Sequence, residues 1–371
     1  MSAPASSPIS LASGYGNFLP PAAAVEAATR VLLAGPLPVT ETAGLPELRE
    51  AVAAAHHSAG GSGPTAANVV VTPGTKVALF ALLQTVLRPG DEVLLPTPNW
   101  FGFRELVARA GGTLRTLPLR PENNYALAPT QLRAALTPRT RVVLFSNPNN
   151  PTGRLYSRAE VAAWLTVTQE FPDLFVLSDE IYNGICFGPE PPPTLLSFPD
   201  PGGRHLVVNG FSKSLALVGW GIGYLLAPVA VARACAAWQH ATGGGVPAPQ
   251  QHAALLATQS AGAITSGLIG QLHPTRRVLL EALADLPQVP PVAPAATYYA
   301  FPDLRAYLRP GPEPAAASAE LVARLQTAGV AVVDGATCDA PGFVRLSYAV
   351  PEPLLREAMA RLRTALELSA C

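Results

Sequence analysis

The sequence predicts an α/β fold, in which a mostly parallel seven-stranded sheet flanked by helices is joined to a smaller α+β domain. Seven short apolar runs recur between residues 69 and 227, which indicates the sheet. Segments of roughly 15–30 residues with helical spacing separate most of these runs, as parallel crossovers require. Near residue 255 the pattern changes to long Ala/Leu helices, and 371 residues are enough for two cores.

The predicted strands are uniformly apolar, which is typical of a sheet covered on both faces. They span residues 69–72, 92–95, 114–117, 141–145, 174–178, 205–209 and 223–227. Between 209 and 223 the gap is too short for a helical crossover. We therefore expect 223–227 to run antiparallel to its neighbours.

The C-terminal third of the sequence is expected to form most of the smaller domain. It holds the run Tyr298–Phe301, a Pro/Ala-rich loop (309–317), a helix, and the short strands 330–333 and 343–347. The N-terminal 40 residues or so are expected to complete it. The predicted large domain is therefore 41–250, and the predicted small domain combines 1–40 with 251–371.

Charge and hydropathy limit the classes of partner. Acidic and basic residues balance at 25 each, so no nucleic-acid or anionic membrane partner is expected. No uninterrupted apolar run reaches the ~18–20 residues of a membrane span. The start, MSAPASSPIS, lacks the basic residues and apolar stretch of a signal peptide and is interpreted as a frayed end. The sequence predicts a cytoplasmic protein.

The cysteines and histidines suggest no metal site. Cys186, Cys235, Cys338 and Cys371 are far apart and form no CxxC pair, so neither a disulfide framework nor a zinc site is predicted. The adjacent histidines His56–His57 are interpreted as a pair on a helix surface.

Lysine is nearly absent from this chain. Of the 25 basic residues only Lys76 and Lys213 are lysines, which leaves 23 arginines. Coding bias is one explanation, because the two residue types serve almost equally well on a solvated surface. Their chemistry differs, because a neutral amine condenses with an aldehyde and a guanidinium effectively cannot. A Schiff-base lysine, if the protein needs one, must be one of these two.

Five loops that follow predicted strands are expected to converge, because ligands bind at the carboxyl ends of strands in open α/β sheets. The first, 73–76 (PGTK), joins a strand to a helix. Its glycine and free N–H groups suit a phosphate, although such junctions are common for structural reasons alone. The second, 98–100, ends in Trp100, which suits either stacking on a flat heteroaromatic ring or a place in the core.

The third and fourth loops are polar. Residues 147–153 (NPNNPTG) form a turn that two prolines and a glycine make rigid, which favours a functional role. In 178–182 (SDEIY), Asp179 ends a buried strand and needs a partner. A protonated pyridine nitrogen would be such a partner, with Tyr182 near the same ring. A helix N-cap is the alternative role for Asp179.

The fifth loop, 210–214 (GFSKS), places Lys213 after a strand with a hydroxyl on each side. Jointly these residues resemble the aminotransferase class I/II family of fold-type I pyridoxal 5′-phosphate (PLP) enzymes, which are aspartate aminotransferase-like. The resemblance spans nearly the whole chain, and NPNNPTG, DEIY and FSK in that order and spacing are its most specific part. The other matching segments are SLASGYGNFLPP, TAGLPELREAVA, VTPGTK, RPGDEVLLPTPNW, GWGIGY and GFVRLSYA.

The resemblance implies a role for each cofactor-binding residue. Lys213 would form the internal aldimine, and Asp179 would keep the pyridinium nitrogen protonated. Tyr182 and Asn150 would hydrogen-bond the phenolic oxygen of the ring. Trp100 would stack on the ring, and the phosphate would be held at Gly74, Thr75, Lys76 and Ser212.

The resemblance also implies which residues bind the substrate. Arg345, in FVRLS, takes the place of the arginine that clamps the substrate α-carboxylate, for which a planar two-pronged donor is apt. Asn150 and a backbone N–H of Gly14 are expected beside it. The side-chain pocket is expected to be lined by Tyr15, Phe18, Phe101 and Tyr298, which favours an aromatic or apolar substrate. Arg104 could instead recruit a dicarboxylate.

The implied activity belongs to amino-acid metabolism. The enzyme would move an amino group between an L-amino acid and a 2-oxo acid through the Lys213 aldimine, with the freed lysine as general base. A homodimer is implied. The alternatives are a specialised lyase, cyclase or oxidase on the same fold, and, less favoured, a non-enzymatic PLP-binding module.

The sequence departs from the family at the phosphate. Gly221 replaces the usual arginine of the GWRxGY-like motif, and Val39 replaces the tyrosine that a partner subunit lends. Each lost charge-assisted bond is worth roughly 1.5–3 kcal/mol. We hypothesise that Lys76 compensates in part. A third difference, Gly210 in place of serine, is interpreted as minor.

Overall fold

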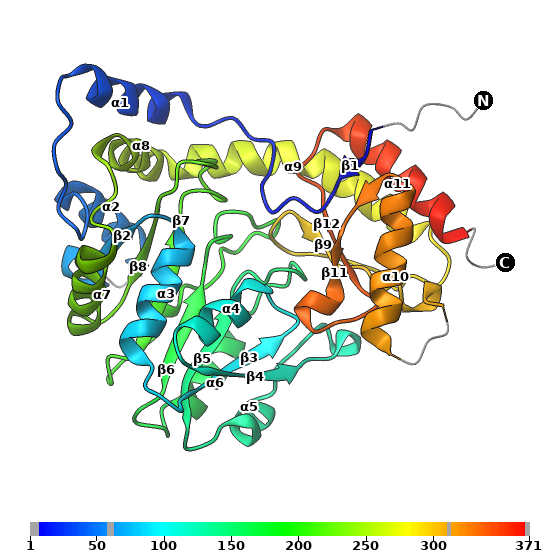
Figure 1. Ribbon diagram of the computed structural model, residues 1–371, viewed down its shortest axis with the longest axis horizontal. Coiled ribbons are helices and arrows are strands. Elements are labelled where there is room, and N and C mark those ends of the chain that lie inside the picture. The colour runs from blue at the N-terminus through cyan, green and yellow to red at the C-terminus, as the bar shows by residue number, and fades with distance from the viewer. Residues whose placement is uncertain (1–6, 58–62, 310–312, 368–371) are drawn as a thin grey trace.

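The computed structural model describes residues 7–57, 63–309 and 313–367. Within them, a seven-stranded sheet forms the centre of the larger part of the molecule (Figure 1). Its order is β2-β8-β7-β6-β5-β3-β4. The strands are β2 (Val69–Thr72), β3 (Glu92–Thr97), β4 (Thr113–Pro118), β5 (Thr140–Ser146), β6 (Phe175–Asp179), β7 (His205–Gly210) and β8 (Gly223–Leu226).

The predicted fold class is confirmed, including the direction of one strand. β8 pairs antiparallel with both β7 and β2, whereas the pairs among β3, β4, β5, β6 and β7 are parallel. The short connection after β7 therefore returns the chain along the sheet, as the spacing predicts.

One strand does not fit the prediction of a sheet covered on both faces. The residues of β4 are exposed or only half-buried, whereas β2, β3, β7 and β8 are buried along their whole length. β4 pairs only with β3 and forms an edge of the sheet. The expectation that 114–117 is a covered strand is wrong. β2, at the opposite edge, is buried because α2, α3 and α7 pack against it, whereas β4 packs against α4.

Helices cover both faces of the sheet. They are α1 (Ala22–Leu33), α2 (Pro46–Ala55), α3 (Thr75–Val86), α4 (Gly102–Arg109), α5 (Pro129–Ala135), α6 (Arg158–Thr168), α7 (Val229–Thr242), α8 (Ala248–Gln259), α9 (Ala261–Ala284), α10 (Pro314–Thr327) and α11 (Glu352–Glu367). Side chains of α3, α4 and α7 share one core cluster with the sheet. Those of α2, α6 and α8 share a second cluster, in which Trp164 packs edge-on against Phe145.

A third core lies in the smaller part of the molecule, among α9, α10 and α11 (Figure 1). Two short sheets belong to it. β1 (Ile9–Ser10) pairs parallel with β10 (Val330–Ala331), and β12 (Val344–Ser347) lies between β11 (Val333–Asp334) and β9 (Tyr299–Ala300). Val344 and Leu346 of β12 pack in this core, and Arg345 lies between them in the strand.

The predicted loop at 309–317 is shorter in the structure. Helix α10 begins at Pro314, so the prediction is wrong from that residue onward. Proline is favoured at the first position of a helix, where its missing N–H would have no partner in any case. Residues 310–312 of that loop and residues 1–6 of the predicted frayed end lie outside the described residues.

The N-terminal segment contacts both parts of the molecule. Leu11 packs in the core of the smaller part, whereas Ala24 and Ala28 of α1 pack in a core of the large sheet. Figure 1 shows α1 lying along α8, above the sheet. The domain limits 1–40, 41–250 and 251–371 stay a prediction.

The interpretation of His56 as a surface residue is wrong. His56 caps the C-terminus of α2, and its buried Nε2 and Nδ1 lie 3.1 Å from the Tyr224 hydroxyl and 3.3 Å from the Thr194 hydroxyl. Burial lowers the pKa of His56 to about 4. Its neighbour His57 is exposed.

No single helix in the described ranges is both long and apolar enough to cross a membrane. The pair α8 and α9, bent by 79°, meets that test only when the two helices are taken together, by length and composition.

Candidate active site

The predicted site residues gather at one edge of the large sheet. Asp179 is the last residue of β6, and Lys213 follows the end of β7. The loop 147–153 follows β5, Trp100 follows β3 and Gly74 follows β2. Because β8 is antiparallel to both β2 and β7, β2 points the same way as the parallel strands. All five loops therefore leave the sheet at its carboxyl edge, where ligands bind in this class of fold.

Lys213 lies at the centre of this group. Its Nζ donates a 2.6 Å hydrogen bond to the Gly14 carbonyl and lies 3.7 Å from the centre of the Tyr15 ring. Burial, and after it the positive charge of Arg345, lower the pKa of Lys213 to about 7, although Asp179 acts in the opposite direction. A large fraction of the amine is therefore neutral near pH 7, as a nucleophile or a general base requires.

The Gly14 carbonyl fixes the N-terminal segment to the site. Besides Lys213, the hydroxyls of Tyr298 and Tyr299 donate to it, at 2.9 and 3.1 Å. The Gly14 carbonyl thus joins a segment near the start of the chain to the lysine and to β9. The expected bond from its N–H to a substrate stays a prediction.

Asp179 is a buried carboxyl group without a cation against it. Its Oδ1 accepts the Ile181 N–H at 3.2 Å, and it forms no ion pair with any described residue. Burial raises its pKa to about 6, despite that bond and the charge of Lys213. The local turn to Ile181 engages Oδ1, and Oδ2 forms no hydrogen bond to a described residue. A protonated ring nitrogen fits this group, because it would stabilise the charged carboxylate.

Arg345 is buried and held in one orientation. It donates from Nη1 to Asn150 Oδ1 and from Nη2 to the Ala12 carbonyl, both at 3.0 Å. The guanidinium stacks on the Tyr299 ring, 4.2 Å from its centre. Its Nε has no hydrogen-bond partner among the described residues. A buried donor of this kind suits an incoming carboxylate.

Tyr299 is a site residue that the sequence analysis missed. Its hydroxyl lies 2.8 Å from that of Tyr182, so it connects the predicted ring ligand to Gly14 and Arg345. Strand alternation could not have found it, because successive residues are expected to face opposite sides, yet Tyr298 and Tyr299 both donate to the Gly14 carbonyl.

The start of α3 has the features of a phosphate site. Gly74 precedes the helix with φ +91°, and no side chain caps the first turn, so its N–H groups remain available. The hydroxyls of Thr75 and Ser212 make no hydrogen bond to another described residue. A Cβ at Gly223 would lie 2.7 Å from the Thr75 nitrogen. Glycine there lets the start of α3 lie against β8.

Gly210 lies close to Thr75 at the start of α3. A Cβ at this position would lie 2.8 Å from Thr75 Cγ2 and 3.2 Å from the Gly223 Cα. A serine would require the side chain of Thr75, one of the predicted phosphate ligands, to shift. The interpretation of Gly210 as a minor difference stays a prediction.

Neither of the two departures from the family pattern supplies a side-chain donor for a phosphate. Gly221 has φ +63°, and a Cβ built on it would meet no atom within 4 Å. Val39 is fully exposed. Lys76 carries the cation on this side of the site, with its Nζ 5.7 Å from the centre of the Trp100 ring. The indole packs edge-on against Phe103, and its stacking on a cofactor stays a prediction.

The expected side-chain pocket is only partly assembled. Phe18 packs against Tyr298 with ring centres 6.1 Å apart, and Tyr15 lies under Lys213. Phe101 is nearly half-exposed beside Trp100. Arg104 forms an exposed ion pair with Asp339 at 2.8 Å, and its recruitment of a dicarboxylate stays a prediction.

A lysine at the carboxyl edge of a parallel sheet, a buried aspartate that suits a pyridinium, and an open helix N-terminus define a PLP-dependent enzyme of fold type I. The chain belongs to the aminotransferase class I and II family, whose model matches residues 6–362. It is a PLP-dependent aminotransferase.

Named relatives are similar over almost the whole chain. An aspartate/prephenate aminotransferase of Thermus thermophilus is 35% identical, with 95% of this chain and 89% of that protein covered. The aspartate/prephenate aminotransferase of Cereibacter sphaeroides is 33% identical, with 96% and 90% covered. The aspartate aminotransferase of Geobacillus stearothermophilus is 31% identical, with 98% and 92% covered.

Solved structures share the fold. The aspartate aminotransferase of Thermus thermophilus with maleate has a TM-score of 0.89 at 34% identity, covering 97% of this chain and 92% of that one. The enzyme of Rhizobium meliloti has a TM-score of 0.91 at 28% identity, with 97% and 92% covered.

Proposed function

We propose that Lys213 is the residue through which this aminotransferase moves an amino group between an L-amino acid and a 2-oxo acid. The observation that carries the proposal is the position of its amine at the carboxyl edge of the sheet, near enough to Asp179 and Arg345 for both charges to act on it. These groups would serve the cofactor ring and the substrate carboxylate respectively.

The side chains gathered at this site support PLP as the cofactor. Lys213 would hold it covalently, Asp179 would pair with its ring nitrogen, and Tyr182 and Asn150 would face its ring oxygen. The phosphate would lie at Gly74, Thr75, Lys76 and Ser212, with Trp100 over the ring. When bound, PLP supplies an electron sink that makes the substrate Cα–H acidic.

Residues of the chain itself would bind the substrate and transfer the proton. Arg345 and Asn150 would hold the α-carboxylate in a fixed orientation, which places the Cα–H toward Lys213. The amine of Lys213 would accept that proton and return it as a general acid. Its pKa of about 7 suits both directions of transfer near neutral pH.

The substrate class is inferred from the relatives and from the pocket. Two relatives are named for aspartate and prephenate. We propose a dicarboxylic amino donor such as aspartate, together with a ring-bearing 2-oxo acid that Tyr15, Phe18 and Tyr298 could contact. A panel of amino donors and 2-oxo acids tests this. Release of ammonia or hydrogen peroxide in place of a 2-oxo acid would instead indicate a redirected PLP enzyme.

A homodimer is part of the proposal. Several apolar side chains on and after α1 are exposed, among them Leu32 at 56%, Leu33 at 81% and Val39 at 101%. Beside them, an apolar cavity of about 390 Å³ lies between α1 and the start of α8. A second copy covering this face would bury both. Light scattering on the native chain and on Leu33→Glu tests this proposal, and a monomeric native chain contradicts it. A cytoplasmic location stays a prediction.

A further inference from the structure

A second cavity lies away from Lys213, where the large sheet meets the smaller part of the molecule. Its volume is about 260 Å³, and its walls come from residues 121–125, 152–155, 290–295 and 301–305, with Phe343. This is slightly below the roughly 300–1,000 Å³ of sites for drug-sized ligands, so it suits a smaller molecule. No residue assigned to the active site lines it.

Part of the cavity lining is apolar. Phe301 and Phe343 stack with ring centres 5.2 Å apart and an interplanar angle of 22°. Val292, which is half-buried, lies in the same lining beside a pair of prolines. This surface suits an aliphatic or aromatic side chain.

Charges of both signs lie next to this apolar surface, with the Arg305 guanidinium 5.2 Å from the centre of the Phe343 ring. Arg305 Nη2 lies 2.6 Å from Asp303 Oδ2 and 3.8 Å from Glu122 Oε1. Tyr125 lines the same space, and its hydroxyl makes no hydrogen bond to any described residue. Burial, followed by the charge of Asp303, raises the pKa of Tyr125, so the hydroxyl remains a donor at neutral pH.

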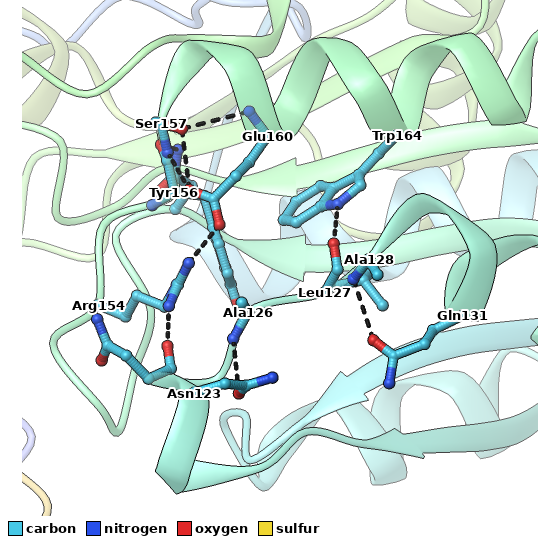
Figure 2. Close-up of polar contacts among 12 residues, drawn as sticks. Asn123, Ala126, Leu127, Ala128, Gln131, Arg154, Tyr156, Ser157, Glu160 and Trp164 are labelled. Carbon is cyan, nitrogen blue, oxygen red and sulfur yellow. Dashed lines mark hydrogen bonds and ion pairs between the residues drawn. The ribbon is translucent and has the colours of Figure 1, made fainter.

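Arg154, which also lines the cavity, is held by three contacts. Arg154 donates to Glu160 and to the Asn124 carbonyl, and its guanidinium lies 4.8 Å from the centre of the Tyr156 ring. Figure 2 shows Arg154 reaching both Glu160 and the backbone beside Asn123. The Arg154 Nε has no partner among the residues that the structure describes.

A ligand complementary to this space carries both charges and an apolar group. A carboxylate would accept from Arg305 and from the Tyr125 hydroxyl, and an ammonium would face Asp303 and Glu122. We propose that this cavity is a second amino-acid site, which binds one free α-amino acid with an apolar or aromatic side chain. This inference goes beyond the proposed function, because the bound amino acid is not the one that reacts.

The position of the cavity couples it to the active site. Thr152 and Arg154 follow Asn150 by two and four residues, and Phe343 precedes Arg345 by two. The Gly153 carbonyl accepts the N–H groups of Ala295 and Ala296 at 2.9 and 3.0 Å, which ties the loop to the opposite wall. A ligand that contacts both walls therefore acts on the Asn150–Arg345 pair. The expected effect is a changed KM for the substrate carboxylate.

Calorimetric titration of the full-length holoenzyme with L-phenylalanine and L-leucine tests the site. The titrated protein is the Arg345→Gln variant, in which the proposed carboxylate clamp of the active site is removed. We expect one molecule bound per chain, and roughly tenfold weaker binding after either Arg305→Ala or Val292→Trp. Arg309→Ala is the matched control, since Arg309 is exposed, pairs with Glu320 and does not line the cavity. 3-Phenylpropanoate and 2-phenylethylamine, which lack one charge each, should bind roughly tenfold more weakly than L-phenylalanine.

Two outcomes would overturn the proposal. One is the lack of saturable binding in the Arg345→Gln chain. The other is binding that neither Arg305→Ala nor Val292→Trp weakens. The coupling is tested in the enzyme without Arg345→Gln, where L-leucine should change the KM for the amino donor and Val292→Trp should remove that change. A KM effect that persists in Val292→Trp reflects competition at the active site and contradicts the coupling. The binding measurements do not depend on transamination. A failure of the proposed function can therefore be told apart from a failure of this second-site proposal.

Discussion

Glu180, which follows Asp179, is expected to destabilise the folded protein as the pH rises. Its side chain is 1% exposed, and Oε1 accepts the Leu195 N–H at 2.8 Å. Oε2 has no hydrogen-bond partner among the described residues. Burial raises the pKa of Glu180 from 4.5 to about 7, and the charge of Asp179 adds to that effect. The native state thus holds a proton that the unfolded state releases at lower pH.

The size of the effect follows from these two pKa values. Between pH 4.5 and about 7 the unfolded chain loses its proton first, so stability falls as the pH rises. A difference of about 2.5 units corresponds to roughly 3 kcal/mol above pH 7. Glu180→Gln keeps an oxygen acceptor for Leu195 and carries no charge. We expect it to raise the free energy of unfolding by up to ~3 kcal/mol at pH 8, and by no more than ~1 kcal/mol at pH 5.

Urea unfolding at pH 5 and pH 8 measures this difference. Glu50→Gln is the matched control, because Glu50 is an exposed glutamate on α2 and its replacement should change stability little at either pH. If Glu180→Gln were no more stable than the native chain at pH 8, or if its gain were the same at both pH values, the argument from burial would fail.

Three further predictions concern the lysines. Lys213→Ala should abolish the visible absorbance that the native chain gains on reconstitution with PLP, and a surviving band in the spectrum would contradict the assignment. The rate of covalent PLP attachment should fall as the pH drops below about 7, because the Lys213 amine then gains a proton, and it should level off above that pH. Stopped-flow absorbance measures this rate. A pH profile of the rate with its midpoint near 10.5 would refute the low pKa of Lys213. Lys76→Ala should weaken PLP binding roughly ten- to hundredfold if Lys76 replaces the missing arginine. An unchanged Kd in equilibrium dialysis would show that it does not.

The fold was predictable because its signals are local. Strand-length apolar runs and helical spacing indicate the parallel sheet, and the short gap after residue 209 indicates the direction of β8. The error at β4 has a different origin. How much of β4 is covered depends on which helices pack against it, and residues distant in the sequence decide that.

The site was predictable where motifs mark the loops and less so where side chains meet across the fold. Lys213, Asp179 and Arg345 follow predicted strands or lie in a recognisable segment. Tyr299 was missed because its role depends on contacts to Gly14 and Tyr182, far away in the chain. The burial of His56 depends on Tyr224 in the same way.

Both lysines of the chain lie at the proposed active site, while the rest of the surface carries arginine. Amine-directed reagents therefore report on the catalytic centre of the folded protein without any engineering, apart from the N-terminal amine. Coupling to an amine-reactive resin would attach the enzyme by the very groups that it needs. A lysine-selective mass label, in contrast, would give a simple readout of cofactor occupancy, because bound PLP would protect Lys213 from modification.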